Sequence, residues 1–163
     1  MDSNTVIKYS LADIEAARQE FLSTRARHNS RMPAPPTPSP PCPCGRPLAY
    51  AACCGRWHAG ALALQAPGAE ELMRSRYSAF TLGLLDYLRA TWHPSTRPTV
   101  LEPMPPGLRW LGLEVRRHAQ QDETHATVEF VARSKLGGRA ERLHETSRFV
   151  REEGCWFYVD GDS

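Results

Sequence analysis

Four of the five cysteines in this chain lie close together and can bind a metal ion. They form two pairs, Cys42 with Cys44 and Cys53 with Cys54. The loop between the pairs contains a glycine and a proline, and it is long enough to bring the second pair back to the first. Four thiolates placed in this way can surround a soft divalent ion tetrahedrally. We therefore predict a structural zinc site with these four ligands, and with His58 outside the ligand set.

The alternative is that the four cysteines are reduced or paired in disulfides. Cys53 and Cys54 are adjacent in sequence, which makes them poor disulfide partners for each other. The N-terminal residues are charged and lack the apolar core of a signal peptide. Metal-bound thiols in a chain without a secretion signal are typical of the reducing cytoplasm. We therefore expect a cytoplasmic protein.

Length and charge narrow the class of protein further. A chain of 163 residues with 41% hydrophobic residues is long enough for one domain with a buried core. The formal charge of +2 gives no reason to expect a nucleic-acid partner, and no apolar run is long enough to cross a membrane. Arg142, His144 and Arg148 form a short basic row on one predicted strand. A solvated sheet face explains that row at least as well as nucleic-acid binding does.

Composition divides the chain into four segments. Residues 1–31 have helical periodicity and are either a tethered docking helix or an extension that precedes a translation start at Met32. Residues 32–41 are rich in proline and predict an extended linker. Residues 42–60 contain the four cysteines, and a segment this small depends on its metal for folding. Residues 67–161 carry the main pattern of helices and strands.

The main segment begins with helices and continues with strands. The spacing predicts a helix over residues 70–82, ended by Gly83, and a shorter one over residues 84–92. A proline-rich loop follows, and then alternating patterns predict strands over residues 108–115, 124–133, 141–151 and 155–159. We expect a bulge near Gly112, a hairpin at Gly137 and Gly138, and a central position for the last strand. The result is an α+β fold, with helices that cover one face of a curved antiparallel sheet.

Two polar residues of this segment are candidates for catalysis. Glu145 shares a strand face with Leu143, Ser147 and Phe149, and a carboxylate among apolar neighbours can transfer protons. The alternative, which we favour, is a structural ion pair with Arg74 or Arg76 on the first helix. His93 stands at a helix end before a proline, where it either caps free carbonyls or takes part in catalysis.

The cysteine spacing resembles a known zinc motif. The pattern Cys-x-Cys-x8-Cys-Cys, with Tyr50 before the second pair and Gly55 after it, is similar to the SEC-C motif, named for the C-terminus of the SecA translocation ATPase. That motif usually carries Gly-Ser-Gly in the loop, where this chain has Gly45-Arg46-Pro47. SEC-C of SecA contacts the chaperone SecB and ribosomes. The resemblance implies a similar docking role here.

The rest of the chain resembles the YchJ family of bacterial proteins, from about Pro41 to the C-terminus. The resemblance is carried by Met73-Arg-Ser-Arg-Tyr-Ser-Ala-Phe80, Tyr87-Leu88, Thr91-Trp-His-Pro94, Glu145-Thr-Ser-Arg-Phe149 and Trp156-Phe-Tyr-Val-Asp-Gly161. It implies a SEC-C module joined to a cone-shaped domain of the nuclear transport factor 2 (NTF2, cystatin-like) fold. It implies no particular activity.

Two functions follow from these residues. The first is a non-enzymatic, zinc-containing adaptor whose SEC-C module docks a protein partner, such as the ribosome or a chaperone, and whose cone binds a partner or small ligand. The second is a small enzyme for proton transfer or hydrolysis that uses Glu145, and His93 with it, in the cone cavity. We favour the adaptor, because the sequence shows no nucleophile–base pair, phosphate loop or open metal site. Many cone-shaped domains also dimerise through the open sheet face, so a homodimer is a further expectation.

Overall fold

The computed structural model describes residues 39–163. The expectations for residues 1–31 and for most of the linker lie outside this described part. Within residues 39–163, no helix is long and apolar enough to cross a membrane.

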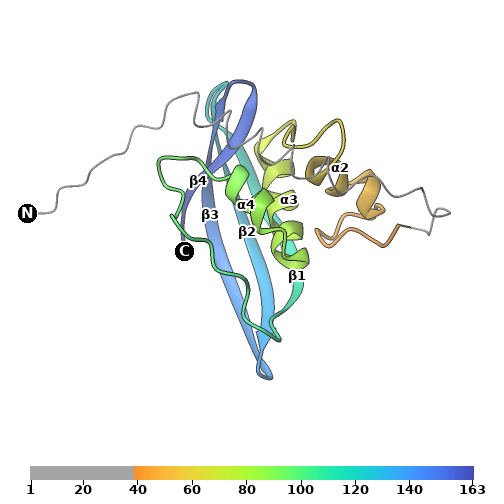
Figure 1. Cartoon of the computed structure of the whole chain (residues 1–163). Helices are drawn as coiled ribbons and strands as arrows, with labels where there is room; N and C mark the ends of the chain where they lie inside the picture. The colour runs from red at the N-terminus through yellow and green to blue at the C-terminus, as the bar shows by residue number, and fades with distance from the viewer. Residues whose placement is uncertain (1–38) are drawn as a thin grey trace, which may run out of the picture.

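The described chain forms two helices on one face of a four-stranded sheet, preceded by the segment that carries the cysteines (Figure 1). In chain order the elements are the short 3-10 helix η1 (Tyr50–Ala52), the helices α2 (Gly55–His58), α3 (Ala69–Leu82) and α4 (Leu85–Ala90), and the strands β1 (Arg109–Gln120), β2 (His125–Leu136), β3 (Arg139–Glu152) and β4 (Cys155–Asp162). The predicted α+β class is therefore confirmed.

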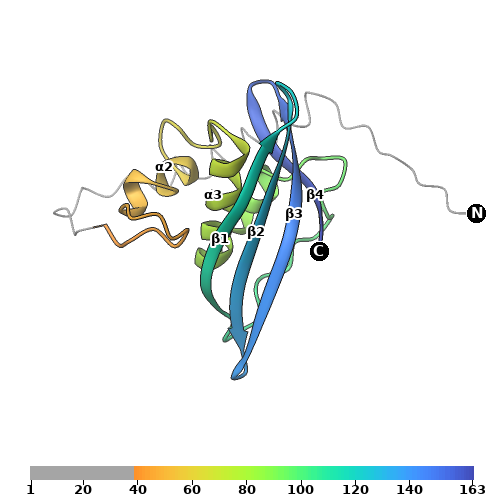
Figure 2. The ribbon, with the colours of Figure 1, turned by 180° about the vertical axis from the view of Figure 1, so that it is seen from behind.

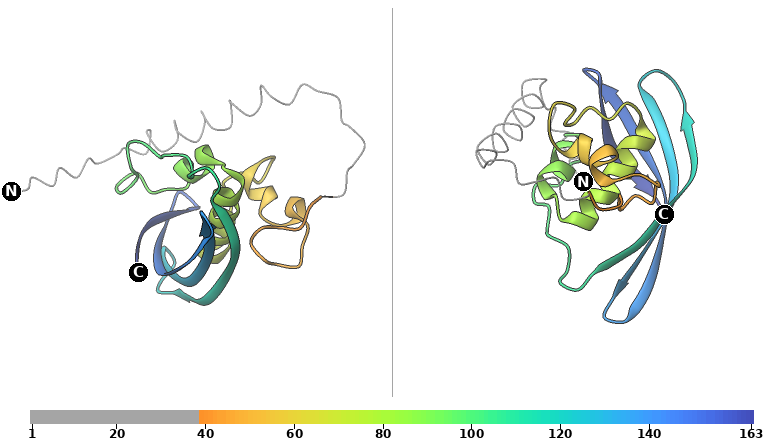
Figure 3. Two further views of the ribbon diagram at one scale, coloured as in Figure 1. Left: turned by 90° about the horizontal axis from the view of Figure 1, so that it is seen from below. Right: turned by 90° about the vertical axis from the view of Figure 1, so that its right-hand side faces the viewer.

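The sheet is an antiparallel meander in the order β1-β2-β3-β4. Its strands curve around α3, so that the concave face meets the helices, as the left view of Figure 3 shows. The view from behind in Figure 2 shows the opposite, open face. The register of β1 against β2 shifts between Trp110 and Gly112, which confirms the predicted bulge, and again between Val115 and Arg117. Such shifts bend a strand and increase its twist.

The predicted central position of the last strand is wrong, because β4 is an edge strand. The segment that follows α4 lies along its free edge and accounts for the apolar pattern. Trp92 forms a parallel bridge with Tyr158, and the backbone N–H of His93 donates to the Tyr158 carbonyl at 2.7 Å. The His93 ring also lies 6.0 Å from the ring of Phe157. A strand covered in this way can carry apolar residues on both faces although it has one strand neighbour.

Helix α3 begins and ends where its sequence predicts. Glu70 and Glu71 occupy its first turn, where carboxylates favour the helix dipole. Gly83 adopts a left-handed conformation with φ of 68°, and its N–H caps the last turn. The second helix is shorter than predicted, because α4 ends at Ala90.

One hydrophobic core joins α2, α3, α4 and the sheet, and the four cysteines form a second, smaller cluster with Tyr50. The inward residues of β2 are buried as the alternation predicts, from Ala126 to Ala132. Trp57, Leu64 and Ala66, which follow the cysteines in sequence, belong to the same core. The cysteine module (residues 42–60) is therefore packed on the main domain and does not stand apart from it.

Candidate metal centre and cavity

The four predicted zinc ligands come together in the structure. The sulfur atoms of Cys42, Cys44, Cys53 and Cys54 all lie within 4.8 Å of one another, and all four residues are buried. The sulfurs of Cys44 and Cys53 are 3.6 Å apart. Tetrahedral zinc with Zn–S bonds of about 2.3 Å requires sulfur–sulfur separations of about 3.8 Å. The donor set and its spacing therefore fit a zinc ion, whereas Cys155 is buried elsewhere as a free thiol.

The four thiols of the cluster differ in how readily they ionise. A hydrogen bond from Cys54 lowers the pKa of Cys44 to about 5, and burial raises the pKa of Cys53 to about 11. The hydrogen bond with Cys44 raises the pKa of Cys54 far above its usual value. Without a metal ion, the cluster therefore favours a single thiolate. A divalent cation would stabilise the negative charge of all four thiolates.

His58 lies outside the cysteine cluster, as predicted. Its ring is fully buried, with Nδ1 2.7 Å from the Tyr50 hydroxyl and Nε2 2.8 Å from the Ser75 carbonyl oxygen. Gly55 allows Tyr50 to lie close, because a Cβ atom at Gly55 would be 2.7 Å from the Tyr50 carbonyl oxygen. The aromatic residue and the glycine of the SEC-C pattern therefore have packing roles beside the cysteines.

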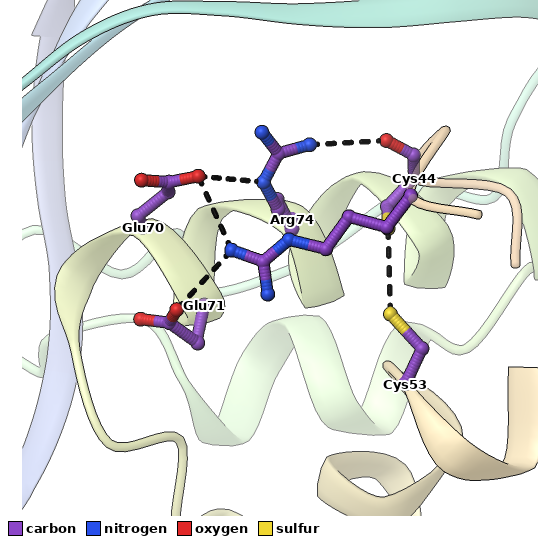
Figure 4. Close-up of polar contacts among 6 residues, drawn as sticks. Cys44, Cys53, Glu70, Glu71 and Arg74 are labelled. Atoms are coloured by element: carbon purple, nitrogen blue, oxygen red, sulfur yellow. Dashed lines mark hydrogen bonds and ion pairs between the residues drawn. The ribbon is translucent and has the colours of Figure 1, made fainter. Parts of the chain in front are cut away.

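Polar contacts attach the cysteine module to α3 (Figure 4). Arg74 donates from Nη1 to the Cys44 carbonyl oxygen at 3.2 Å and from Nε to Glu70 at 2.8 Å. Arg46 pairs with Glu70 and Glu71, both at 3.2 Å. Arg46 is one of the residues at which the loop departs from Gly-Ser-Gly. In this chain that departure supplies a charged contact to the helix.

The second feature is a cavity between α3 and the concave face of the sheet. Its volume is about 160 Å³. Met73, Tyr77 and Phe80 line it from the helix, which confirms the face predicted for α3. Leu143 also lines it and is 40% exposed, so this residue lies at the opening. The remaining lining residues are Arg76, Trp92, Trp110, Phe130, Ala132, Glu145, Ser147 and Tyr158.

Arg76 is the buried charge of this cavity, with only 3% of its surface exposed. Its Nη1 donates to the Leu88 carbonyl oxygen and to Thr91 Oγ1, each at 2.8 Å. Its guanidinium carbon is 4.6 Å from the ring centroid of Tyr158 and 5.2 Å from that of Trp92. Burial lowers the pKa of Arg76 to about 10, so it stays charged at neutral pH.

Glu145 lies in the cavity, but the predicted ion pair with Arg74 or Arg76 is wrong. Among the described residues, no arginine side-chain nitrogen lies within 4.0 Å of this carboxylate. Instead its Oε1 accepts from Ser147 Oγ at 2.6 Å and from the Tyr158 hydroxyl at 3.4 Å. Gly161 permits this placement, because a Cβ atom there would overlap the carboxylate.

His93 is not part of the cavity. Its Nε2 is 3.1 Å from Glu152 Oε1 and its Nδ1 is 2.6 Å from Ser95 Oγ, so its side chain does not cap helix carbonyls. The structure therefore does not bring His93 and Glu145 into one site.

The basic row on β3 is largely neutralised by acidic neighbours. His144 contacts Glu129 at 2.8 Å, and Arg148 pairs with Asp160 and Asp162. Arg142, the third member of the row, has no carboxylate oxygen within 4.0 Å of its side-chain nitrogens among residues 39–163, and it lies opposite Arg133 on β2.

Comparison with known proteins now decides the family. Residues 68–161 match the family described as "YchJ, middle NTF2-like domain". A UPF0225 protein of Bordetella parapertussis is 66% identical over 131 residues, which cover 80% of this chain and 98% of that protein. The chain belongs to the YchJ family. A UPF0225 protein of Cupriavidus pinatubonensis is 56% identical over 140 residues, which cover 82% of this chain and 95% of that one.

Solved structures support the same fold. A SEC-C motif containing protein from Rhodopseudomonas palustris aligns with a TM-score of 0.65 and 31% identity, over 75% of this chain and 97% of that chain. A SEC-C motif containing protein from Psychrobacter arcticus aligns with a TM-score of 0.61 and 31% identity, over 75% of this chain and 80% of that one. The NTF2-like domain preceded by a cysteine module is therefore the architecture of this YchJ-family chain.

Sequence reasoning missed several residues that shape the site. Ser78, on α3, lies with its hydroxyl oxygen 3.7 Å from the Cys42 sulfur. Trp92 and Trp110 line the cavity, and their buried indole N–H groups have no hydrogen-bond partner within residues 39–163. An aromatic residue that packs in a core and one that lines a cavity give the same sequence pattern, so no signal separates them.

Proposed function

We propose that this chain is a zinc-containing small-molecule binding protein. In this proposal the NTF2-like cavity holds the ligand, and Cys42, Cys44, Cys53 and Cys54 hold a structural zinc ion. Four thiolates leave no open coordination position, so the zinc supplies folding energy rather than catalysis. The observation that carries the proposal is the cavity itself, which opens at Leu143 and has buried polar groups among apolar walls. Such a combination is typical of ligand sites.

The cysteine module packs on α3, the helix that forms one wall of the cavity. It contacts α3 through Arg74, Arg46 and His58, and the same helix contributes Met73, Arg76, Tyr77 and Phe80 to the cavity lining. A rigid α3 keeps the cavity walls in place before a ligand arrives, which favours binding.

The proposal is tested by filling the cavity. Ala132 is 3% exposed and lines the cavity from β2, so Ala132→Leu places a larger side chain in that space. The matched control is Ala140→Leu, the same change at an exposed position of β3. Native mass spectrometry and thermal shift against a chemically varied set of small molecules should detect ligands for the parent and for Ala140→Leu, and none for Ala132→Leu. Equal binding by all three proteins would contradict the proposal.

A proton-transfer enzyme is the second candidate, because Glu145 lies in the cavity without an arginine partner among the described residues. Tyr158 supplies a hydroxyl beside it, and burial raises the pKa of Tyr158 to about 12, so the phenol stays protonated at neutral pH. An enzyme would need Glu145 for turnover and not for binding. Glu145→Gln should then abolish turnover of the cavity ligand without weakening its binding, whereas a pure binding protein shows no turnover in either form.

Docking on a protein partner, such as the ribosome or a chaperone, stays a prediction, and so do homodimer formation and the cytoplasmic location. Leu48 and Leu62, which lie near the cysteines in sequence, are both 46% exposed.

A further inference from the structure

The size of the cavity limits its ligand to a small molecule. A volume of about 160 Å³ is close to the roughly 150 Å³ of an engineered protein cavity that holds benzene. The walls are mainly aromatic. Trp110 packs against Tyr77 with ring centroids 5.5 Å apart, and Trp92 packs edge-on against Tyr158 at 5.1 Å. A ring or a compact aliphatic body fits these walls better than a chain of polar groups does.

The charge within the cavity favours an anionic group on that ligand. Arg76 is the fully buried cation, and no carboxylate oxygen lies within 4.0 Å of its nitrogens in the described part of the chain. Within residues 39–163, its side chain donates hydrogen bonds from Nη1 to two neutral acceptors. A buried cation without an ionic partner is stabilised by an anion that enters beside it.

Two tryptophans of the cavity wall contain buried N–H groups. The indole N–H groups of Trp92 and Trp110 are buried and have no partner within residues 39–163. Both tryptophans line the cavity, whereas Trp156, which has the same unpartnered N–H, does not. Both nitrogen atoms have almost no accessible surface, so the N–H groups lie behind the cavity surface and the two tryptophans present their rings to a ligand.

Glu145 is the opposing influence, because its negative charge repels an anion. It is only partly buried, however, and its Oε1 already accepts hydrogen bonds from Ser147 and Tyr158. Arg76 is more deeply enclosed than Glu145, so the field beside Arg76 is positive. The two charges together orient a ligand, with its anionic end at Arg76 and its uncharged body elsewhere in the cavity.

We propose that this cavity binds a small organic monocarboxylate about the size of benzoate, with its carboxylate at Arg76 and its ring against the aromatic walls. The inference rests on the proposed function and adds the chemical class of the ligand. The indole rings of Trp92 and Trp110 form part of the aromatic wall against which the body of the ligand packs.

The test is isothermal titration calorimetry of the full zinc-loaded chain with four probes of similar size. Benzoate and cyclohexanecarboxylate should bind at least about tenfold more tightly than benzamide, their uncharged counterpart, and benzylamine should not bind. Equal affinities for benzoate and benzamide would overturn the carboxylate class and leave the proposed function standing. Absence of binding by every probe at millimolar concentration, with other molecules bound in the cavity-filling experiment, would overturn the class alone. Absence of ligands in both experiments would overturn the proposed function as well.

Substitutions identify the groups that carry the preference. Arg76→Met should remove the preference for benzoate over benzamide. Should that variant fail to fold, the ratio of affinities in the parent protein still decides the proposal. Trp110→Phe replaces the indole by a smaller phenyl ring and so removes part of the aromatic wall, and it should weaken benzoate binding severalfold. Trp156→Phe is the matched control, because it makes the same replacement outside the cavity, and it should leave the Kd unchanged. Equal effects of the two tryptophan substitutions would contradict the assigned position of the ligand.

Discussion

At the scale of single residues, the cavity is defined by two opposite charges that do not pair. Arg76 and Glu145 both line it, yet each finds its hydrogen bonds elsewhere. The Coulomb attraction of Glu145 is only a minor influence on the pKa of Arg76, which burial lowers to about 10. Both charges therefore remain available to a ligand.

The absence of an ion pair gives a prediction for Glu145→Gln. The amide oxygen can still accept from Ser147 and Tyr158, so only the charge assistance of those hydrogen bonds is lost. We expect the free energy of unfolding to fall by less than about 1.5 kcal/mol, as measured by urea denaturation. A fall of about 3 kcal/mol or more is the signature of a broken buried pair and would show that Glu145 holds a guanidinium in solution. Gly161→Ala, which displaces the same carboxylate, is the comparison and should destabilise more.

The partner of Glu145 illustrates where residue-level prediction ends. Periodicity places Leu143, Glu145, Ser147 and Phe149 on one face of β3, and the structure confirms that face. The arginine pair was wrong because a side chain's partner depends on how α3 is rotated over the sheet. Arg74 turns toward Glu70 and the cysteine module, and Arg76 turns toward α4. Strand alternation alone carries no information on that rotation.

At the scale of elements, α3 connects the cysteine module with the cavity. One part of its surface meets Cys42 through Ser78 and the Cys44 carbonyl through Arg74, and another part supplies cavity walls. Loss of the metal should therefore loosen this helix and not the module alone.

Cys54→Ser tests that link, with Cys155→Ser as the matched control. Cys54 belongs to the cluster, and Cys155 is a buried free thiol outside it. Because a structural zinc site contributes on the order of 10 kcal/mol, we expect Cys54→Ser to lose zinc and to lower Tm by more than about 10 °C. Amide hydrogen exchange should accelerate along Ser75 to Ala79 before it does so in β2 and β3. Cys155→Ser should keep one zinc per chain by elemental analysis. Full zinc content in Cys54→Ser, or unchanged exchange along α3, would refute the link.

Sequence patterns located most elements because turn and cap residues mark their ends. Gly83 ends α3, and Gly137 and Gly138 turn β2 into β3. The position of β4 was not readable in this way. Both faces of β4 are apolar because the segment from Thr91 to Thr96 packs along its edge. This contact, which includes the hydrogen bond from Thr96 to the Val159 carbonyl, joins residues that are far apart in sequence.

At the scale of the whole molecule, the cysteine module reaches the core of the cone through Trp57. Trp57 and Leu64 pack with α3 and the sheet, so the two sequence segments fold as one body. The clustering of the four cysteines was predictable from their spacing, and the NTF2-like domain was predictable from the family resemblance. The attachment between them was not, since it depends on contacts such as that of Arg46 with Glu70, between residues far apart in sequence.

The central claim is that the cavity beside Arg76 binds a carboxylate ligand, and the indole N–H resonances of the chain test it directly. The chain has four tryptophans, and of these Trp92 and Trp110 line the cavity whereas Trp57 and Trp156 do not. A nitrogen-15 NMR titration of the full zinc-loaded chain with benzoate should shift the indole signals of Trp92 and Trp110 in a saturable manner and leave those of Trp57 and Trp156 in place. Saturable shifts at Trp57 or Trp156 alone, or no shift at any of the four, would contradict the claim.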